Sequence, residues 1–261
     1  MPTQDVTTAT AELTSHKVVS EQEWVEARKA LLEKEKQYTR MRDELSLQRR
    51  QLPWVKVEKN YAFDGPNGKQ TLADLFDGRS QLAIYHFMLG PGWEQGCQSC
   101  SFLADHFDGL IPHVNARDLT FAVVSRAPID EIQSFQKRMG WNFKWLSSNK
   151  NSFNFDYHVS ATPEGVKSGK TYYNFQETKS PSEEMPGLSV FYKNPDGEIF
   201  HTYSAYARGL EDMISAYMII DYSPRGRHEE GLSYPMAWVR HHDRYEEKPD
   251  VDQIRPAGDR S

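Results

Sequence analysis

The chain has 261 residues, of which 38% are hydrophobic and 26% are charged, so it is long enough to bury a core without disulfide bonds. Its formal net charge of −6 provides no broad basic surface for a phosphate backbone, so nucleic acid is not an expected partner. The polar N-terminus lacks the pattern of a secretory signal, and no apolar run is long enough to span a bilayer. We therefore expect a cytoplasmic location and no membrane partner.

The first part of the chain is predicted to be a flexible tail followed by one long helix. Residues 1–18 are polar and rich in threonine, whereas residues 19–52 contain neither proline nor glycine. Ser20 and Glu23 form a capping-box pattern at the start of this helix. One apolar residue recurs every seven positions along it: Trp24, Leu31, Tyr38 and Leu45. This narrow stripe fits either a helix laid on its own domain or a helix that joins two copies of the chain, so a homodimer is one expected assembly.

Residues 53–222 show an alternation of strands and helices. The segment 81–89, QLAIYHFML, is nearly all apolar and too short for a buried helix, so we predict a strand that is buried on both faces of a sheet. The other predicted elements are a hairpin around 65–68, a helix at 97–114, a strand at 119–125, a helix opened by Pro128 and stopped at Gly140, a short strand within 141–148, a hairpin of 187–192 with 198–206, and a helix at 209–221. No helix or strand is predicted in a polar, aromatic insert at about 149–184 or in a C-terminal extension at 223–261. This order predicts an α/β layer fold with a mixed sheet.

Cys97 and Cys100 are the only cysteines of the chain, and they follow the predicted strand 81–89 across the loop GPGWEQG. This position places Cys97 at the carboxyl end of a central strand and at the start of a helix, where open α/β sheets have their binding crevices. Unpaired N–H groups at a helix start stabilise a thiolate and lower its pKa. Cys100, one turn further, could attack a mixed disulfide at Cys97 and release the substrate, which would be a protein or a small molecule that contains a disulfide. The pattern predicts Cys97 as the nucleophile and Cys100 as the resolving thiol.

Two other interpretations of the cysteine pair remain open. The pair could provide two thiolates to a metal, but histidines such as His86, His106 or His113 would have to complete the site. The two residues could also be incidental core cysteines. No phosphate-binding glycine loop or dinucleotide fingerprint is present, so the sequence predicts no cofactor, and a metal is not the favoured interpretation.

Five stretches resemble a bacterial family that is named as a domain of unknown function and described as predicted dithiol-disulfide oxidoreductases: YHFMLGPGWEQGCQSCSFLADHFDG, VVSRAPIDEIQSFQKRMGW, MPGLSVFYKNPDG, HTYSAYARG and PMAWVRHHDRY. They cover most of residues 18–245. The resemblance implies a thioredoxin-like fold, in which a mixed central sheet is flanked by helices, here with a long N-terminal helix and a C-terminal extension. It also implies a cis-proline opposite the dithiol at Pro186; an ordinary trans proline is the alternative.

The same resemblance suggests three further site residues. Thioredoxins keep an acidic residue beneath the dithiol as a proton shuttle, and His86 occupies roughly that place; the alternative is a hydrogen-bonded core histidine. Glu94, three residues before Cys97, could exchange protons or simply be solvated. Trp93 is expected to cover the thiols, as the thioredoxin tryptophan does, or to have only a packing role.

A thiol peroxidase is the alternative enzyme, because VVSRAPIDEIQSFQKRMGW also resembles a strand and helix of peroxiredoxins. Peroxiredoxins place Thr or Ser three residues before the reactive cysteine and Pro seven before it, and these positions are Glu94 and Gly90 here. Arg126 could bind an anion, but a solvated loop residue is expected. The run from His241 to Asp243 suggests a metal cluster, yet adjacent helical residues point in different directions, so a surface role is expected. A non-catalytic thioredoxin-like module that binds a metal or a partner is the third interpretation.

Overall fold

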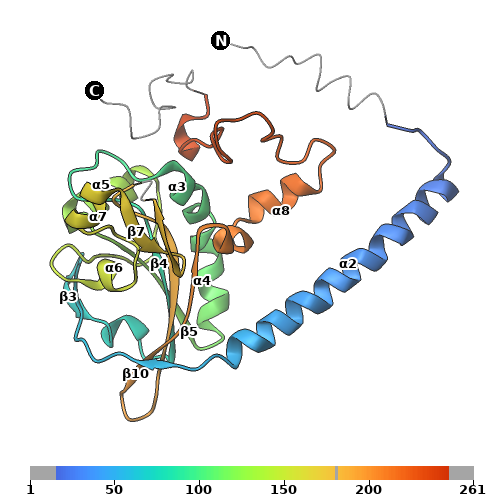
Figure 1. Cartoon of the computed structure of the whole chain (residues 1–261). Coiled ribbons are helices and arrows are strands. Elements are labelled where there is room, and N and C mark those ends of the chain that lie inside the picture. The colour runs from blue at the N-terminus through green and yellow to red at the C-terminus, as the bar shows by residue number, and fades with distance from the viewer. Residues whose placement is uncertain (1–15, 180–181, 247–261) are drawn as a thin grey trace. The chain divides into compact units, whose positions relative to one another are not determined.

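The computed structural model describes residues 16–179 and 182–246 (Figure 1). Most of the expected tail 1–18, and residues 247–261 of the expected extension, therefore lie outside the described residues. The described parts of Met1–Pro53 together with Ile219–His228 form one compact unit, and those of Trp54–Met218 with Glu229–Ser261 form the other. Across the described part of the chain, no helix combines the length and the apolar character needed to cross a membrane.

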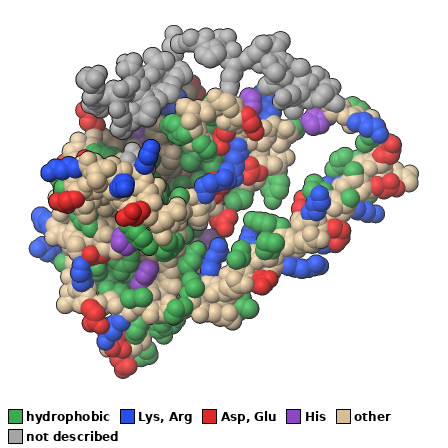
Figure 2. Space-filling model, viewed as in Figure 1, with side chains coloured by type: hydrophobic (Ala, Val, Ile, Leu, Met, Phe, Trp, Pro, Cys, Tyr) green, Lys and Arg blue, Asp and Glu red, His purple; other side chains and the backbone are tan. Residues whose placement is uncertain are grey.

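The long N-terminal helix is confirmed as α2 (Glu21–Arg50). Ser20 caps it as the sequence predicts, because the Ser20 hydroxyl accepts from the Glu23 N–H and the Glu23 carboxylate accepts from the Ser20 N–H. Hydrophobic and charged side chains alternate along this helix (Figure 2). The apolar side chains of the stripe and the neighbouring Met41 are between 45% and 61% exposed: Trp24, Leu31, Tyr38, Met41 and Leu45. Whether the chain's own domain or a second copy of the chain covers this stripe stays a prediction.

The larger unit is built on an eight-stranded sheet with the order β1-β10-β9-β4-β5-β6-β2-β3. The strands are β1 (Val55–Lys56), β2 (Ala62–Gly65), β3 (Gly68–Thr71), β4 (Gln81–His86), β5 (Leu119–Ser125), β6 (Trp145–Ser147), β9 (Gly187–Lys193) and β10 (Ile199–Tyr206). β4, β5 and β6 are parallel, and β9 pairs antiparallel with both β4 and β10. A strand–helix–strand unit with a hairpin on the other side of its first strand is the thioredoxin-like arrangement, so this fold prediction is confirmed.

Helices and a small second sheet complete the fold. The helices are α3 (Gln98–Ala104), α4 (Phe107–Asn115), α5 (Ile129–Arg138), α6 (Phe153–Asp156), α7 (Pro163–Ser168) and α8 (Ser215–Asp221), with 3-10 turns η1 (Asp74–Phe76), η2 (Ala207–Met213) and η3 (His242–Arg244). The single helix expected at 97–114 is divided into α3 and α4. The insert at about 149–184, for which the sequence predicts no element, contains α6, α7 and the hairpin of β7 (Lys170–Tyr173) with β8 (Gln176–Lys179).

The alternation of side chains along β4 separates two aromatic cores, one on each face of the sheet. On one face, Ile84 joins a buried cluster that contains Phe153 and Tyr157, and the His86 ring packs on the same two aromatic rings. On the other face, the Tyr85 ring packs against Phe107 of α4. Neighbouring residues of the central strand therefore face different cores, and this determines which of them can reach the cysteines.

Candidate active site

The chain turns sharply between β4 and α3 and places Cys97 at the N-cap of α3. The Cys97 N–H donates to the Met88 carbonyl at 3.0 Å, which returns the loop to the end of β4. Gly96 makes the close approach possible, because a Cβ atom there would lie 2.5 Å from the Phe87 ring. Both the N–H and the hydroxyl of Ser101 donate to the Cys97 carbonyl, each at 2.9 Å, so this carbonyl is fixed by the first turn of α3.

The two thiols are free and have different environments. Cys97 is half-buried, whereas Cys100 is 2% exposed. Hydrogen bonds from the Cys100 thiol, from the N–H groups of Cys100 and Ser99, and from the Ser99 hydroxyl lower the pKa of Cys97 to about 7 and outweigh burial. Burial raises the pKa of Cys100 well above its ordinary value, and the neighbouring Cys97 adds to this effect. At neutral pH, therefore, Cys97 is the thiol that ionises and Cys100 stays protonated.

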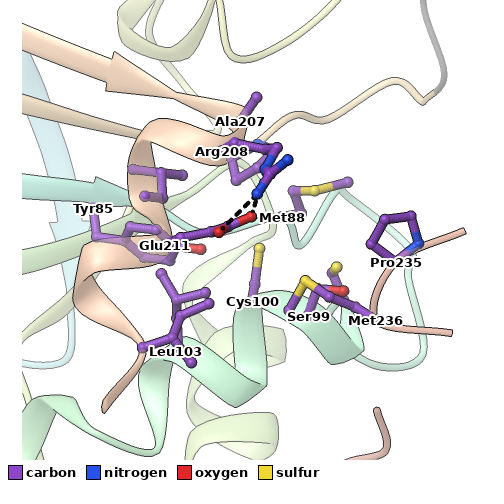
Figure 3. A pocket seen from close by; sticks show the side chains of 14 residues that line it. Tyr85, Met88, Ser99, Cys100, Leu103, Ala207, Arg208, Glu211, Pro235 and Met236 are labelled. Carbon is purple, nitrogen blue, oxygen red and sulfur yellow. Dashed lines mark hydrogen bonds and ion pairs between the residues drawn. The ribbon is translucent and has the colours of Figure 1, made fainter. Parts of the chain in front are cut away.

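A pocket of about 240 Å³ lies beside the thiols (Figure 3). Both cysteines line it, and most of the remaining wall is apolar: Met88, Leu103, Pro186, Leu210, Ile214, Pro235 and Met236. Arg208 and Glu211 also line it, and they form an ion pair with each other at 2.8 Å. In Figure 3, Cys100 stands between Leu103 on one side and Ser99 and Met236 on the other. The pocket gives a small apolar group direct access to the dithiol.

Tyr85 of β4 is a site residue that the sequence analysis missed. Its side chain is fully buried and lines the pocket, and its hydroxyl makes no hydrogen bond within the described part of the chain. Burial, followed by the nearby Cys100, raises the pKa of Tyr85 well above its ordinary value, so the hydroxyl stays a neutral donor beside the Cys100 sulfur. The two-residue period of a strand could have revealed that Tyr85 faces the thiols, since the side chains of residues 85 and 86 lie on opposite faces of the sheet.

His86, by contrast, does not lie beneath the thiols, so its predicted place as a proton shuttle is wrong. Its ring is 1% exposed on the opposite face of the sheet, with Nε2 2.9 Å from the Ser189 hydroxyl. The Ser189 hydroxyl in turn lies 3.0 Å from that of Ser204. Burial lowers the pKa of His86 to about 3 and keeps the ring neutral. The alternative interpretation, a hydrogen-bonded core histidine, describes this position.

The predicted cis bond before Pro186 is also wrong, because the described residues contain no cis peptide bond. The chain on both sides of this proline is extended, and its backbone is hydrogen-bonded to neighbouring segments. The Met185 N–H donates to the Val159 carbonyl at 2.8 Å, and Gly187 pairs with His86 in the sheet. Pro186 nevertheless lines the thiol pocket, as the resemblance implied.

Trp93 and Glu94 do not line the thiol pocket, so the expectation that Trp93 covers the thiols is wrong. The Trp93 N–H donates to the Gly90 carbonyl at 3.2 Å in a tight turn, and the indole ring lies directly on Gly90. Both side chains line a second pocket with Glu131 and Arg138 of α5. The turn therefore directs the loop toward α5 and away from the thiols.

Of the residues with an expected surface role, Arg126 is half-buried and His241 is buried, whereas His242 is exposed as expected. The Arg126 guanidinium forms a 2.5 Å ion pair with Glu184, whose side chain is 1% exposed and whose pKa burial raises. His241 is 1% exposed and its Nε2 lies 2.9 Å from the Gly96 carbonyl, whereas His242 Nδ1 lies 2.6 Å from Asp105. Within the described ranges, no three His, Cys, Asp or Glu side chains are grouped closely enough to hold a metal ion.

The fold and the site together define a thioredoxin-like protein with a paired dithiol at the start of a helix. The family model described as "Bacterial protein of unknown function (DUF899)" matches residues 13–245, so the chain belongs to that family. No curated protein matches the chain.

Several solved structures are similar at low identity. The bacterioferritin comigratory protein of Xanthomonas campestris is 13% identical with a TM-score of 0.41, over 59% of this chain and 86% of that one. Peroxidoxin BcpB of Mycobacterium tuberculosis is 11% identical with a TM-score of 0.41, over 65% and 97%. A protein assigned as thiol:disulfide interchange protein DsbE of Chlorobium tepidum is 13% identical with a TM-score of 0.39, over 63% and 97%.

Proposed function

We propose that this protein is a thiol-disulfide oxidoreductase in which Cys97 attacks the substrate disulfide and Cys100 resolves the intermediate. The observation that carries the proposal is the difference between the two thiols. Cys97 is accessible, and its pKa is lowered to about 7, whereas Cys100 is buried and its pKa is raised. Nucleophilic attack requires a thiolate with access to substrate, and resolution requires a second thiol held beside the first one.

The reaction consists of two exchanges. The Cys97 thiolate attacks one sulfur of the substrate, forms a mixed disulfide and releases the other substrate sulfur as a thiolate. Cys97 then no longer carries the negative charge that opposes ionisation of Cys100, so Cys100 loses its proton more easily. The Cys100 thiolate attacks the Cys97 sulfur and releases the second half of the substrate. The protein dithiol thereby provides two electrons, and an external dithiol reductant restores it.

Tyr85 supports the second exchange in this proposal. Its hydroxyl lies beside the Cys100 sulfur and lowers the pKa of Cys100 against the larger effect of burial. Hydrogen bonds to a charged group typically contribute about 1.5–3 kcal/mol, so the donor stabilises the Cys100 thiolate when this thiolate forms.

The substitution Cys100→Ser tests the proposal. The variant should accumulate a covalent mixed disulfide at Cys97 that dithiothreitol releases, which intact-protein mass spectrometry measures, while the matched variant Cys97→Ser should form none. A thiol peroxidase would instead consume dilute peroxide rapidly and accumulate sulfenic acid at Cys97. A metal-binding module would purify with stoichiometric metal that either substitution removes. Either of these results would replace the proposal.

A further inference from the structure

The C-terminal segment from Glu229 to Arg244 forms one wall of the thiol pocket, through Pro235 and Met236. One carboxylate holds this segment in place. Oε1 of Glu229 accepts from the Tyr217 hydroxyl at 2.7 Å, from the Met236 N–H at 2.9 Å and from the Trp238 indole N–H at 2.8 Å. Hydrogen bonds to a charged acceptor are among the stronger ones in proteins, so the wall is fixed at its pocket side.

The same segment is held a second time, next to Cys97. Asp243 accepts from the Arg138 guanidinium at 2.9 Å and 3.0 Å, and His241 lies against the Gly96 carbonyl one residue before Cys97. The Trp238 ring packs edge-on against Phe102 of α3, with ring centroids 5.5 Å apart. An extended protein segment that needed this space would have to displace several such contacts.

The size and polarity of the pocket limit what can enter it. Its volume of about 240 Å³ lies below the roughly 300–1,000 Å³ of typical small-molecule pockets, so it suits a small substituent. Its wall is mostly apolar, and its two charged side chains, Arg208 and Glu211, are paired with each other. Against the apolar part of the wall a charged substituent would lose its hydration, whereas an apolar one gains free energy from burial.

We propose that the substrate is a small disulfide with uncharged, apolar substituents, and that the pocket closed by Pro235 and Met236 binds the substituent next to the sulfur that Cys97 attacks. This inference rests on the proposed function. The net reaction converts R–S–S–R and the protein dithiol into two R–SH and a Cys97–Cys100 disulfide. Two electrons and two protons pass from the protein to the substrate, and an external dithiol returns them.

The test measures mixed-disulfide formation on the full-length Cys100→Ser protein with three probes: diphenyl disulfide, oxidised glutathione and insulin. Each rate is divided by the rate of the same disulfide with a free thiol such as N-acetylcysteine, which corrects for intrinsic reactivity. The normalised rate for diphenyl disulfide should exceed those for oxidised glutathione and insulin by at least about tenfold, since burial of one small apolar group contributes 1.4 kcal/mol or more. Equal normalised rates for the three disulfides would overturn the inference and leave the proposed function standing.

A second variant tests the wall itself. Met236 has a positive φ of 70°, so Met236→Gly removes the side chain from the pocket without backbone strain. It should lower the preference for diphenyl disulfide at least threefold and allow insulin to react faster. The matched control is Asn174→Gly, an exposed residue with a φ of 51° outside the pocket, which should change neither rate. If no probe forms an adduct while iodoacetamide still labels Cys97, the proposed function itself has failed.

Discussion

At the scale of single residues, the two cysteines differ because of what surrounds their sulfur atoms. Cys97 receives several hydrogen bonds that stabilise its thiolate, and Cys100 is buried next to it. Iodoacetamide labelling of the native protein should therefore occur first at Cys97, with a half-maximal rate near pH 7 instead of about 8.5 for a free cysteine. The rate should rise with pH through this value, because the thiolate is the reactive form. Peptide mass spectrometry over a pH series measures this, and faster labelling of Cys100 would contradict it.

Tyr85 provides a second prediction at this scale. Removing its hydroxyl by Tyr85→Phe takes away the donor beside Cys100, so release of the second thiol from the mixed disulfide should slow by about tenfold or more. The pH at which this step reaches half its maximal rate should rise, because the Cys100 thiolate is less stable. Attack by Cys97 should change little.

The matched control for this substitution is Tyr157→Phe, in the core on the opposite face of the sheet. Single-turnover measurements with the reduced protein separate attack from release. An unchanged pH profile of release in Tyr85→Phe would show that the hydroxyl has only a packing role.

At the scale of elements, periodicity predicted most of the architecture. The apolar segment from residue 81 and the strand at 119–125 became β4 and β5, and the capping-box pattern at Ser20 became the start of α2. The error at His86 arose at a finer level, because a strand that is apolar on both faces shows no polar alternation that reveals which residue faces the thiols. The placement of Trp93 depended on the turn at Gly90, which local patterning does not specify.

At the same scale, the exposed stripe of α2 predicts how two copies of the chain pair. We expect the seven-residue repeat of Trp24, Leu31, Tyr38 and Leu45 to pair with the same stripe of a second copy, since apolar side chains at this spacing form helix seams. The double substitution Leu31→Glu with Leu45→Glu should convert a dimer into a monomer, because it places charges in the seam.

The matched control for α2 is Lys29→Glu, an exposed position in register with neither the Trp24 repeat nor Met41, which should leave the mass unchanged. Multi-angle light scattering gives the mass of each protein in solution. A monomeric unsubstituted chain would exclude this assembly, and the stripe would then need another partner.

At the scale of the whole molecule, the pocket depends on contacts between distant parts of the larger unit. His241 contacts the Gly96 carbonyl although the two residues are 145 positions apart in the sequence, and Arg138 binds Asp243 at a separation of 105. A surface role was the natural expectation for the run from His241 to Asp243, and of these residues only His241 is buried, which nothing in its local sequence indicates. Long-range pairing of this kind is decided by tertiary packing, and for that reason the extension could not be assigned to the site in advance.

The attachment of this extension can be tested through Glu229. Glu229→Ala leaves three donors without their shared acceptor. The free energy of local opening at residues 229–246 should therefore fall by at least the contribution of one hydrogen bond to a charged group, about 1.5–3 kcal/mol. Amide hydrogen exchange should then accelerate by about tenfold or more in this segment and at residues 97–103, while strands β4, β5 and β9 keep their protection. The control Glu183→Ala, an exposed carboxylate, should leave all of these rates unchanged. Uniform acceleration across the sheet would mean that the extension is part of one cooperative unit, and no acceleration would mean that Glu229 does not hold the wall of the pocket.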